Sequence, residues 1–101
     1  LALAYQLDGK IAAQWGTHTH VQTADEQILP NGTGYLTDLG MTGPVRSVIG
    51  VRPEQSIANF RGELTSRYEV APGPCMLTGA VFTYDAAAKR CTGAERVRIL
   101  D

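Results

Sequence analysis

Gly16-Thr17-His18-Thr19-His20-Val21-Gln22-Thr23 holds both histidines of the chain and follows a short apolar run. In extended backbone each residue rises about 3.3 Å, so two histidines separated by one residue point to the same side, about 6.6 Å apart. Imidazoles placed in this way can converge on one metal ion or reach two ions roughly 3.5–4 Å apart. They can equally be polar side chains on a loop, because imidazole has many other uses. The stretch alone leaves both interpretations open.

Hydroxyl and carboxylate side chains near the histidines suggest further site residues. Thr17 and Thr19 are small, so they leave room for an ion and can hydrogen-bond to a ligand or substrate. A catalytic zinc site commonly has three protein ligands plus water, and Asp38 would complete such a set with His18 and His20 if it folds back. The other interpretation of Asp38 is a solvated surface acid.

The composition fits an ordinary globular domain and excludes several functions. The chain has 101 residues, 44% hydrophobic and 19% charged, which amounts to one domain or less. A formal net charge of −1 gives no basic surface, so we expect no bulk electrostatic binding of nucleic acid. No window approaches the roughly 20 apolar residues that span a bilayer. No signal peptide is visible, and a cytoplasmic location is expected.

The two cysteines, Cys75 and Cys91, show no metal-site spacing. They would be able to pair across neighbouring strands. Without a secretory signal, free cytosolic thiols are the favoured interpretation.

The residues before the histidine stretch predict a helix followed by a strand. Leu3 and Leu7 share a helix face and Asp8-Gly9 supplies a glycine stop, which indicates the tail of a helix whose start is missing. Lys10–Trp15 is apolar and long enough for a buried strand. This αβ step places the histidines beyond the carboxyl end of the strand, where ligands gather in layered α/β folds.

A hairpin and a helix are predicted next. Asn31-Gly32 lies between the apolar stretches Gln27–Leu29 and Tyr35–Thr37, which is a strong hairpin signal. A helix is expected to begin at Arg52-Pro53-Glu54, with proline in its first turn. It carries one apolar stripe that is expected to face the core: Ile57, Phe60 and Leu64.

The C-terminal third predicts an antiparallel hairpin with one wet face. Met76–Tyr84 and Ala94–Leu100 alternate in polarity, and a polar connector over 85–93 joins them. Val97 and Ile99 share one face of the second strand, and the arginines beside them share the other. That pattern is typical of a half-buried strand whose charged face meets solvent.

The histidine motif resembles that of a known enzyme family. The stretch from Gly16 to Glu26 is similar to the last metal-binding motif of calcineurin-like metallophosphoesterases, which in most members reads Gly-His-x-His. Here Thr17 separates the glycine from the first histidine. The form Gly-Thr-His-Thr-His, followed by Asp38-Leu39-Gly40-Met41-Thr42-Gly43-Pro44 and Ser47-Val48-Ile49-Gly50, looks like the branch of bacterial YmdB-like phosphodiesterases. The resemblance covers nearly the whole chain.

This resemblance implies a fold and an activity. The fold is α/β, with residues 1–101 forming the C-terminal part of a metallophosphoesterase αββα sandwich that ends in an antiparallel hairpin. The activity is hydrolysis of small phosphodiesters, including 2′,3′-cyclic nucleotides, at a site with two divalent or trivalent ions of iron or manganese. His18 would ligate the second ion and His20 the first. Substrate-binding residues are expected in the same region: Thr17, Thr19, Gly40 and Thr42.

The family's remaining ligands come from upstream motifs that this chain lacks: an Asp, a Glu and Asn, an Asn-His pair and a further His. The general acid is the histidine of that pair, so no catalytic residue is assigned here. The free chain should be inactive, and its partner would be the missing N-terminal half of the same fold. Open apolar faces and sheet edges would make an isolated monomer unstable or self-associating.

Two other interpretations remain. In the first, the chain is a non-catalytic module in which His18 and His20 bind an ion alone or at the interface of a homo-oligomer. In the second, it is a small α/β structural domain with surface histidines, which leaves the extended motif unexplained.

Overall fold

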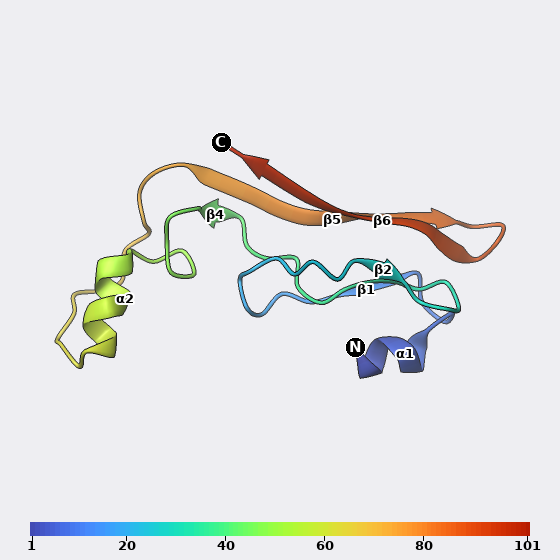
Figure 1. The fold of residues 1–101 in the computed structure, drawn as a ribbon, viewed down its shortest axis with the longest axis horizontal. Helices are drawn as coiled ribbons and strands as arrows, with labels where there is room; N and C mark the ends of the chain where they lie inside the picture. Colours follow the sequence, from blue (N-terminus) through green and yellow to red (C-terminus); the bar gives the residue numbers. More distant parts are fainter.

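The computed structural model describes residues 1–101 as two three-stranded sheets and two short helices (Figure 1). The elements in chain order are α1 (Ala2–Leu7), β1 (Ala13–Trp15), β2 (Gln27–Ile28), β3 (Gly34–Leu36), β4 (Gly43–Pro44), α2 (Pro53–Phe60), β5 (Cys75–Asp85) and β6 (Arg90–Leu100). The long ribbon of β5 and β6 runs along the smaller sheet, while α1 and α2 lie toward opposite ends of the molecule. The α/β class and the C-terminal hairpin are confirmed.

The smaller sheet has the order β1-β3-β2, with β3 in the centre and all three of its residues buried. β3 pairs with β2 antiparallel, which confirms the predicted hairpin, and with β1 parallel, which was not predicted. The predicted strand Lys10–Trp15 is too long, because β1 begins at Ala13. The turn after α1 continues through Lys10, whose N–H donates to the carbonyl of Leu7 at 2.8 Å.

The second sheet has the order β4-β5-β6 and is antiparallel throughout. The ladder of β5 and β6 extends to Asp85 opposite Arg90, so the predicted connector over 85–93 shrinks to four residues, 86–89. β4 adds two residues to the edge of β5.

One face of the ribbon packs on the smaller sheet through an aromatic side chain. The ring of Phe82 stacks on Trp15 at a centroid distance of 6.0 Å. A methyl group on Gly34 would lie 2.5 Å from Phe82, so only glycine lets the ribbon approach β3 this closely. The thiol of Cys91 donates to the carbonyl of Ala12 at 3.1 Å in the same contact.

The face of the ribbon that turns inward is the opposite of the predicted one. Arg96 faces the smaller sheet, where its guanidinium pairs with Glu26 at 2.9 Å. The apolar residues of the other face are about half exposed, with Leu77 at 46%, Val81 at 50% and Ile99 at 59%. Arg96 and Arg98 are themselves exposed, as predicted, but the apolar face opposite them is not the buried one. Alternation gives which residues share a face, not which face finds a partner.

The arm formed by residues 45–74 carries α2, which starts with proline as predicted. The helix ends at Phe60, before Leu64, and it buries no residue. Ile57 is 50% exposed and Phe60 90% exposed, so the predicted core-facing stripe is wrong for this chain.

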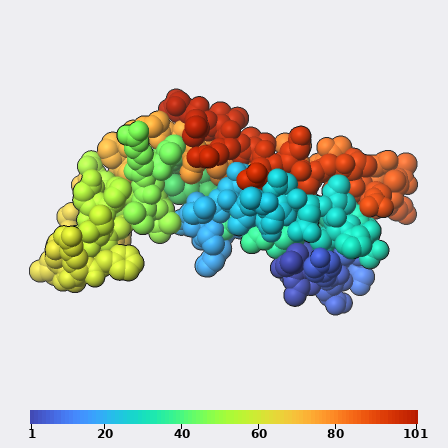
Figure 2. Space-filling view, in the orientation of Figure 1, coloured from blue at the N-terminus to red at the C-terminus, as the bar shows by residue number.

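The molecule exposes more surface than a compact chain of its mass. Its accessible surface is 6844 Å², against about 5,600 Å² expected for 10.9 kDa. Its radius of gyration is 17.5 Å, against roughly 13 Å for a compact domain of this length. Figure 2 shows the elongated outline, with α1 at the edge of the body, where Ala4 packs against Leu29 and Tyr35. Neither helix has the length and hydropathy that a bilayer crossing requires.

Both cysteines are free thiols, as favoured from the sequence. Cys75 starts β5, whereas Cys91 pairs with Tyr84 near the hairpin loop. Nine residues of strand separate these two levels of the ladder, about 30 Å, so the thiols cannot pair.

Candidate functional site

The histidine loop, residues 16–26, leaves the carboxyl end of β1 and lies against the residues that follow β3. Because these two strands are parallel, their ends meet at one edge of the sheet, as predicted for a site. Gly16 makes the close contact possible, since a methyl group there would lie 2.6 Å from the carbonyl oxygen of Thr37. The carbonyl of Gly16 accepts the N–H of Leu39 at 2.9 Å.

The buried carboxylate of Asp38 holds the histidine loop in place through hydrogen bonds. Its side chain is 1% exposed, and one carboxylate oxygen accepts the N–H groups of His18 at 3.0 Å and Thr19 at 2.6 Å. The same oxygen accepts the hydroxyl of Thr19 at 2.7 Å, and the other oxygen accepts the N–H of Gly40 at 2.8 Å. Burial raises the pKa of Asp38, but these four hydrogen bonds outweigh it and hold the pKa well below its usual range. The carboxylate is therefore ionised.

Thr19 fixes the backbone on both sides of His20. Its hydroxyl donates to Asp38 and accepts the N–H of Val21 at 3.2 Å. Between these contacts His20 has a φ of 65°, a left-handed conformation that few residues other than glycine adopt. The threonine thus holds a metal-ligand candidate in a backbone geometry that it would rarely adopt unaided.

A second carboxylate braces the far end of the same loop. Asp25 accepts the hydroxyl of Thr23 at 2.7 Å, the N–H of Thr37 at 3.1 Å and the hydroxyl of Thr37. Burial raises the pKa of Asp25, and the bonds from Thr23 and Thr37 more than offset this, so the pKa lies below its ordinary value. Sequence reasoning did not find this role or the anchoring role of Asp38. The spacing Asp38-Leu39-Gly40, typical of an Asx turn, was the one available signal for the latter.

Gln22 joins the loop to the ribbon, a role that the sequence did not predict. Its side-chain amide donates to the carbonyls of Gly79 at 2.9 Å and Val97 at 3.0 Å. The loop is therefore held by the residues after β3 on one side and by the β5–β6 ribbon on the other.

The two imidazoles are exposed and fit the role of metal ligands, which imidazole fills for zinc, iron and copper. No group of three or more His, Cys, Asp or Glu side chains gathers anywhere in the chain. The trio of His18, His20 and Asp38 does not form, because the Asp38 carboxylate is committed to backbone N–H groups. His18 and His20 are therefore the two candidate ligands of this region.

The four predicted substrate-binding residues lie in different surroundings. Thr17 is exposed on the loop, and Thr42 lines the same pocket as His20. Gly40 has a φ of 81°, and a methyl group there would lie 2.7 Å from the hydroxyl of Thr78. The space beside Gly40 is therefore filled by other residues of the protein rather than open to a substrate. The Thr19 hydroxyl is engaged with Asp38. Substrate binding by these residues stays a prediction.

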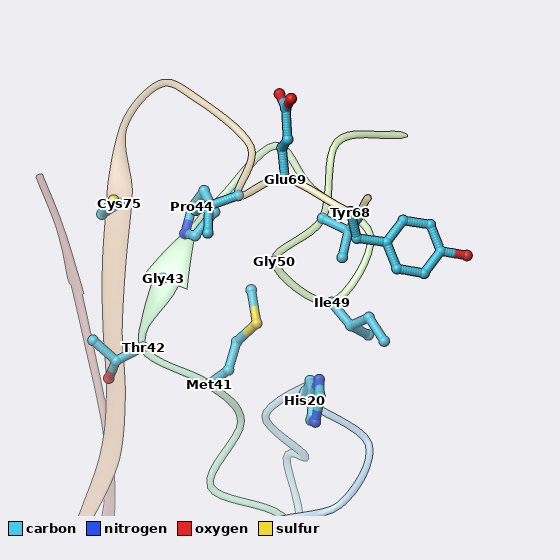
Figure 3. A pocket seen from close by; sticks show the side chains of 12 residues that line it. His20, Met41, Thr42, Gly43, Pro44, Ile49, Gly50, Tyr68, Glu69 and Cys75 are labelled. Carbon is cyan, nitrogen blue, oxygen red and sulfur yellow. The ribbon is translucent and has the colours of Figure 1, made fainter. Parts of the chain in front are cut away.

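A pocket of about 550 Å³ opens beside His20, between the loop, β4 and the arm (Figure 3). Half of its twelve lining residues are hydrophobic. The lining residues include His20, Met41, Thr42, Ile49, Tyr68 and Cys75. Its volume falls within the roughly 300–1,000 Å³ of small-molecule sites.

Comparison with known proteins finds one matching family and relatives that are named as phosphodiesterases or phosphatases. Residues 1–97 match the family described as YmdB-like protein. The 2′,3′-cyclic-nucleotide 2′-phosphodiesterase of Bacillus subtilis is 46% identical over 101 residues, all of this chain and 38% of that protein. A putative phosphatase/phosphodiesterase of Mycoplasma pneumoniae is 41% identical over 101 residues, 99% of this chain and 36% of that protein. The chain thus spans well under half the length of these relatives.

Two solved structures share the fold. A hypothetical protein from Thermus thermophilus matches with a TM-score of 0.89 at 35% identity, over 99% of this chain and 39% of the other. A novel phosphatase from Mycoplasma pneumoniae matches with a TM-score of 0.89 at 41% identity, over 98% of this chain and 36% of the other. These matches confirm the predicted fold.

Proposed function

The chain belongs to the YmdB-like protein family, and on that premise we propose that it supplies part of the active site of a metal-dependent phosphodiesterase. The substrates are small phosphodiesters, with 2′,3′-cyclic nucleotides foremost, as the name of the Bacillus subtilis relative suggests. Residues 1–101 would be the C-terminal portion of one catalytic domain. The supporting observation is the pair of exposed histidines on a loop that a buried carboxylate holds beside a pocket.

His18 and His20 would each supply one imidazole to a different ion of an iron or manganese pair. Such a pair, when bound, activates a water molecule and neutralises the charge of the phosphate. The chain's own contribution is to orient these imidazoles before metal arrives. The Asp38 and Thr19 bonds do this, because they fix the loop backbone from the buried side and leave both rings exposed.

Thr17, exposed on the histidine loop, has a hydroxyl group that is free for a phosphate oxygen, and Thr42 would contact the substrate in the pocket beside His20. Neither makes a side-chain hydrogen bond within the chain. A cytoplasmic location is part of the proposal.

The test measures metal content and hydrolysis of 2′,3′-cyclic AMP by the natural protein in its full length. We expect about two metal ions per chain and turnover, with both lost or strongly reduced in His18→Ala and His20→Ala. Gln6→Ala, an exposed polar residue on α1, is the control. Metal binding without turnover would favour the non-catalytic module instead.

A further inference from the structure

A turn near the start of the arm holds Ile49 in a backbone conformation that is unfavourable for isoleucine. Val48 and Val51 exchange two hydrogen bonds of 2.9 Å around a two-residue turn formed by Ile49 and Gly50. Both turn residues have positive φ, 47° and 93°, as a type I′ turn requires. Asn-Gly is the preferred sequence there, and a β-branched residue at positive φ is a genuine outlier. The turn by itself therefore does not account for an isoleucine at this position.

What Ile49 contributes is a wall of the pocket beside His20. Figure 3 shows Met41 reaching into the space between β4 and His20, with Ile49 across from it. The ring of Tyr68 and the carboxylate of Glu69 point away from that space. Glu69 is also paired with Arg52 at 2.9 Å, so no charged side chain enters the pocket.

An apolar space next to a candidate metal ligand favours the uncharged part of a phosphodiester substrate over its charged phosphate. The charged phosphate has no partner among Met41 and Ile49, and burying an unpaired charge is costly. An uncharged planar group is favoured there, because a thioether packs well against aromatic rings and isoleucine covers the other side.

We propose that this pocket receives the base of a nucleotide whose phosphate lies at the histidine loop, with Met41 and Ile49 as the specificity-determining walls. The inference rests on the proposed phosphodiesterase function and names the part of the substrate that the chain recognises. The strained turn and the uncharged interior are its two independent supports.

Ile49→Asn in the full-length protein tests the proposal, because asparagine suits positive φ and the fold should not suffer. We expect a Tm equal to or above that of the wild type. KM for 2′,3′-cyclic AMP should rise about tenfold with kcat unchanged, as for loss of one apolar contact. Methyl riboside 2,3-cyclic phosphate, which lacks only the base, should be hydrolysed as before. Ile57→Ala, a half-exposed isoleucine outside the pocket, is the control.

Cys75 gives a second readout that needs no turnover, since this exposed thiol lines the pocket. Alkylation of Cys75 should be slowed by 2′,3′-cyclic AMP but not by inorganic phosphate, and the protection should be lost in Ile49→Asn. Protection without hydrolysis would support the pocket and overturn the phosphodiesterase function. Hydrolysis of both substrates with an equal effect of Ile49→Asn on each, or with none, would overturn the pocket.

Discussion

The hydroxyl group of Thr19 holds the backbone on both sides of His20. Its hydroxyl is the only group that joins the Asp38 carboxylate to the backbone beyond His20. Thr19→Val keeps the shape of the side chain and removes both bonds. We expect manganese affinity, measured by calorimetry on the full-length protein, to fall about ten- to a hundredfold, as when other ligand-orienting partners are removed.

Thr19→Ser separates this positioning role from a packing role. Serine retains the hydroxyl, so it should restore most of the affinity, and Thr92→Val on the exposed face of β6 should change nothing. Affinity in Thr19→Ser as low as in Thr19→Val would show that the methyl group matters instead.

Asp25 makes the loop sensitive to acid. Its pKa lies below the ordinary 3.8 in the folded protein, so its stabilisation is complete above the unfolded value and is lost as the pH falls through the folded value. Asp25→Asn should therefore lower the urea midpoint at neutral pH, and its difference from the wild type should shrink below about pH 4. Asp101→Asn is the control, because that terminal side chain is exposed. A difference that does not change with pH would contradict this account.

At the scale of the element, the contact between ribbon and sheet depends on Gly34. Gly34→Ala would bring a methyl group to 2.5 Å from Phe82 and 3.1 Å from the Cys91 sulfur. We expect it to cost about 1–3 kcal/mol in the free energy of unfolding, as overpacking does. Gly79→Ala, in the ribbon and with nothing within 4 Å of the added methyl group, should be nearly neutral in the same urea titration. Equal effects of the two changes would place the tight contact elsewhere.

Local patterns predicted the elements better than their partners. Alternation gave the ribbon of β5 and β6, and Asn31-Gly32 gave the β2–β3 hairpin, because both depend on neighbours in the chain. The parallel pairing of β1 with β3 and the inward face of the ribbon depend on Phe82 meeting Gly34, 48 positions away by number. No periodicity encodes such a contact.

The same division holds within the site. The histidine stretch was visible as a motif, and Thr42 lines the same pocket as His20, while its binding role stays a prediction. The anchoring of His18 and Thr19 by Asp38 joins groups about twenty residues apart, and its acceptors and donors include backbone atoms that carry no sequence signal. The turn at Ile49 was not predicted, because isoleucine is not among the residues that favour positive φ in a type I′ turn.

For the whole molecule, the excess of exposed apolar surface predicts how the isolated chain behaves. Eleven of its residues are buried, and large side chains such as Leu77, Phe60 and Trp15 are at least 46% exposed. We expect the separate 101-residue polypeptide to self-associate in sedimentation velocity at micromolar concentration, since exposed patches and strand edges drive association. A monodisperse monomer with one sharp thermal transition would contradict this expectation.

Cys91 lies on the inner side of the ribbon, and its burial against β3 makes its chemical modification a measure of local opening. Its sulfur is 1% exposed and lies against Gly34, so a reagent reaches it only while the ribbon is lifted from β3. Where closing outpaces the chemistry, the ratio of its modification rate to that of a free thiol is the equilibrium constant of this opening. One natural sulfur atom therefore reports the fraction of time for which the two sheets are apart, without any label having to be introduced.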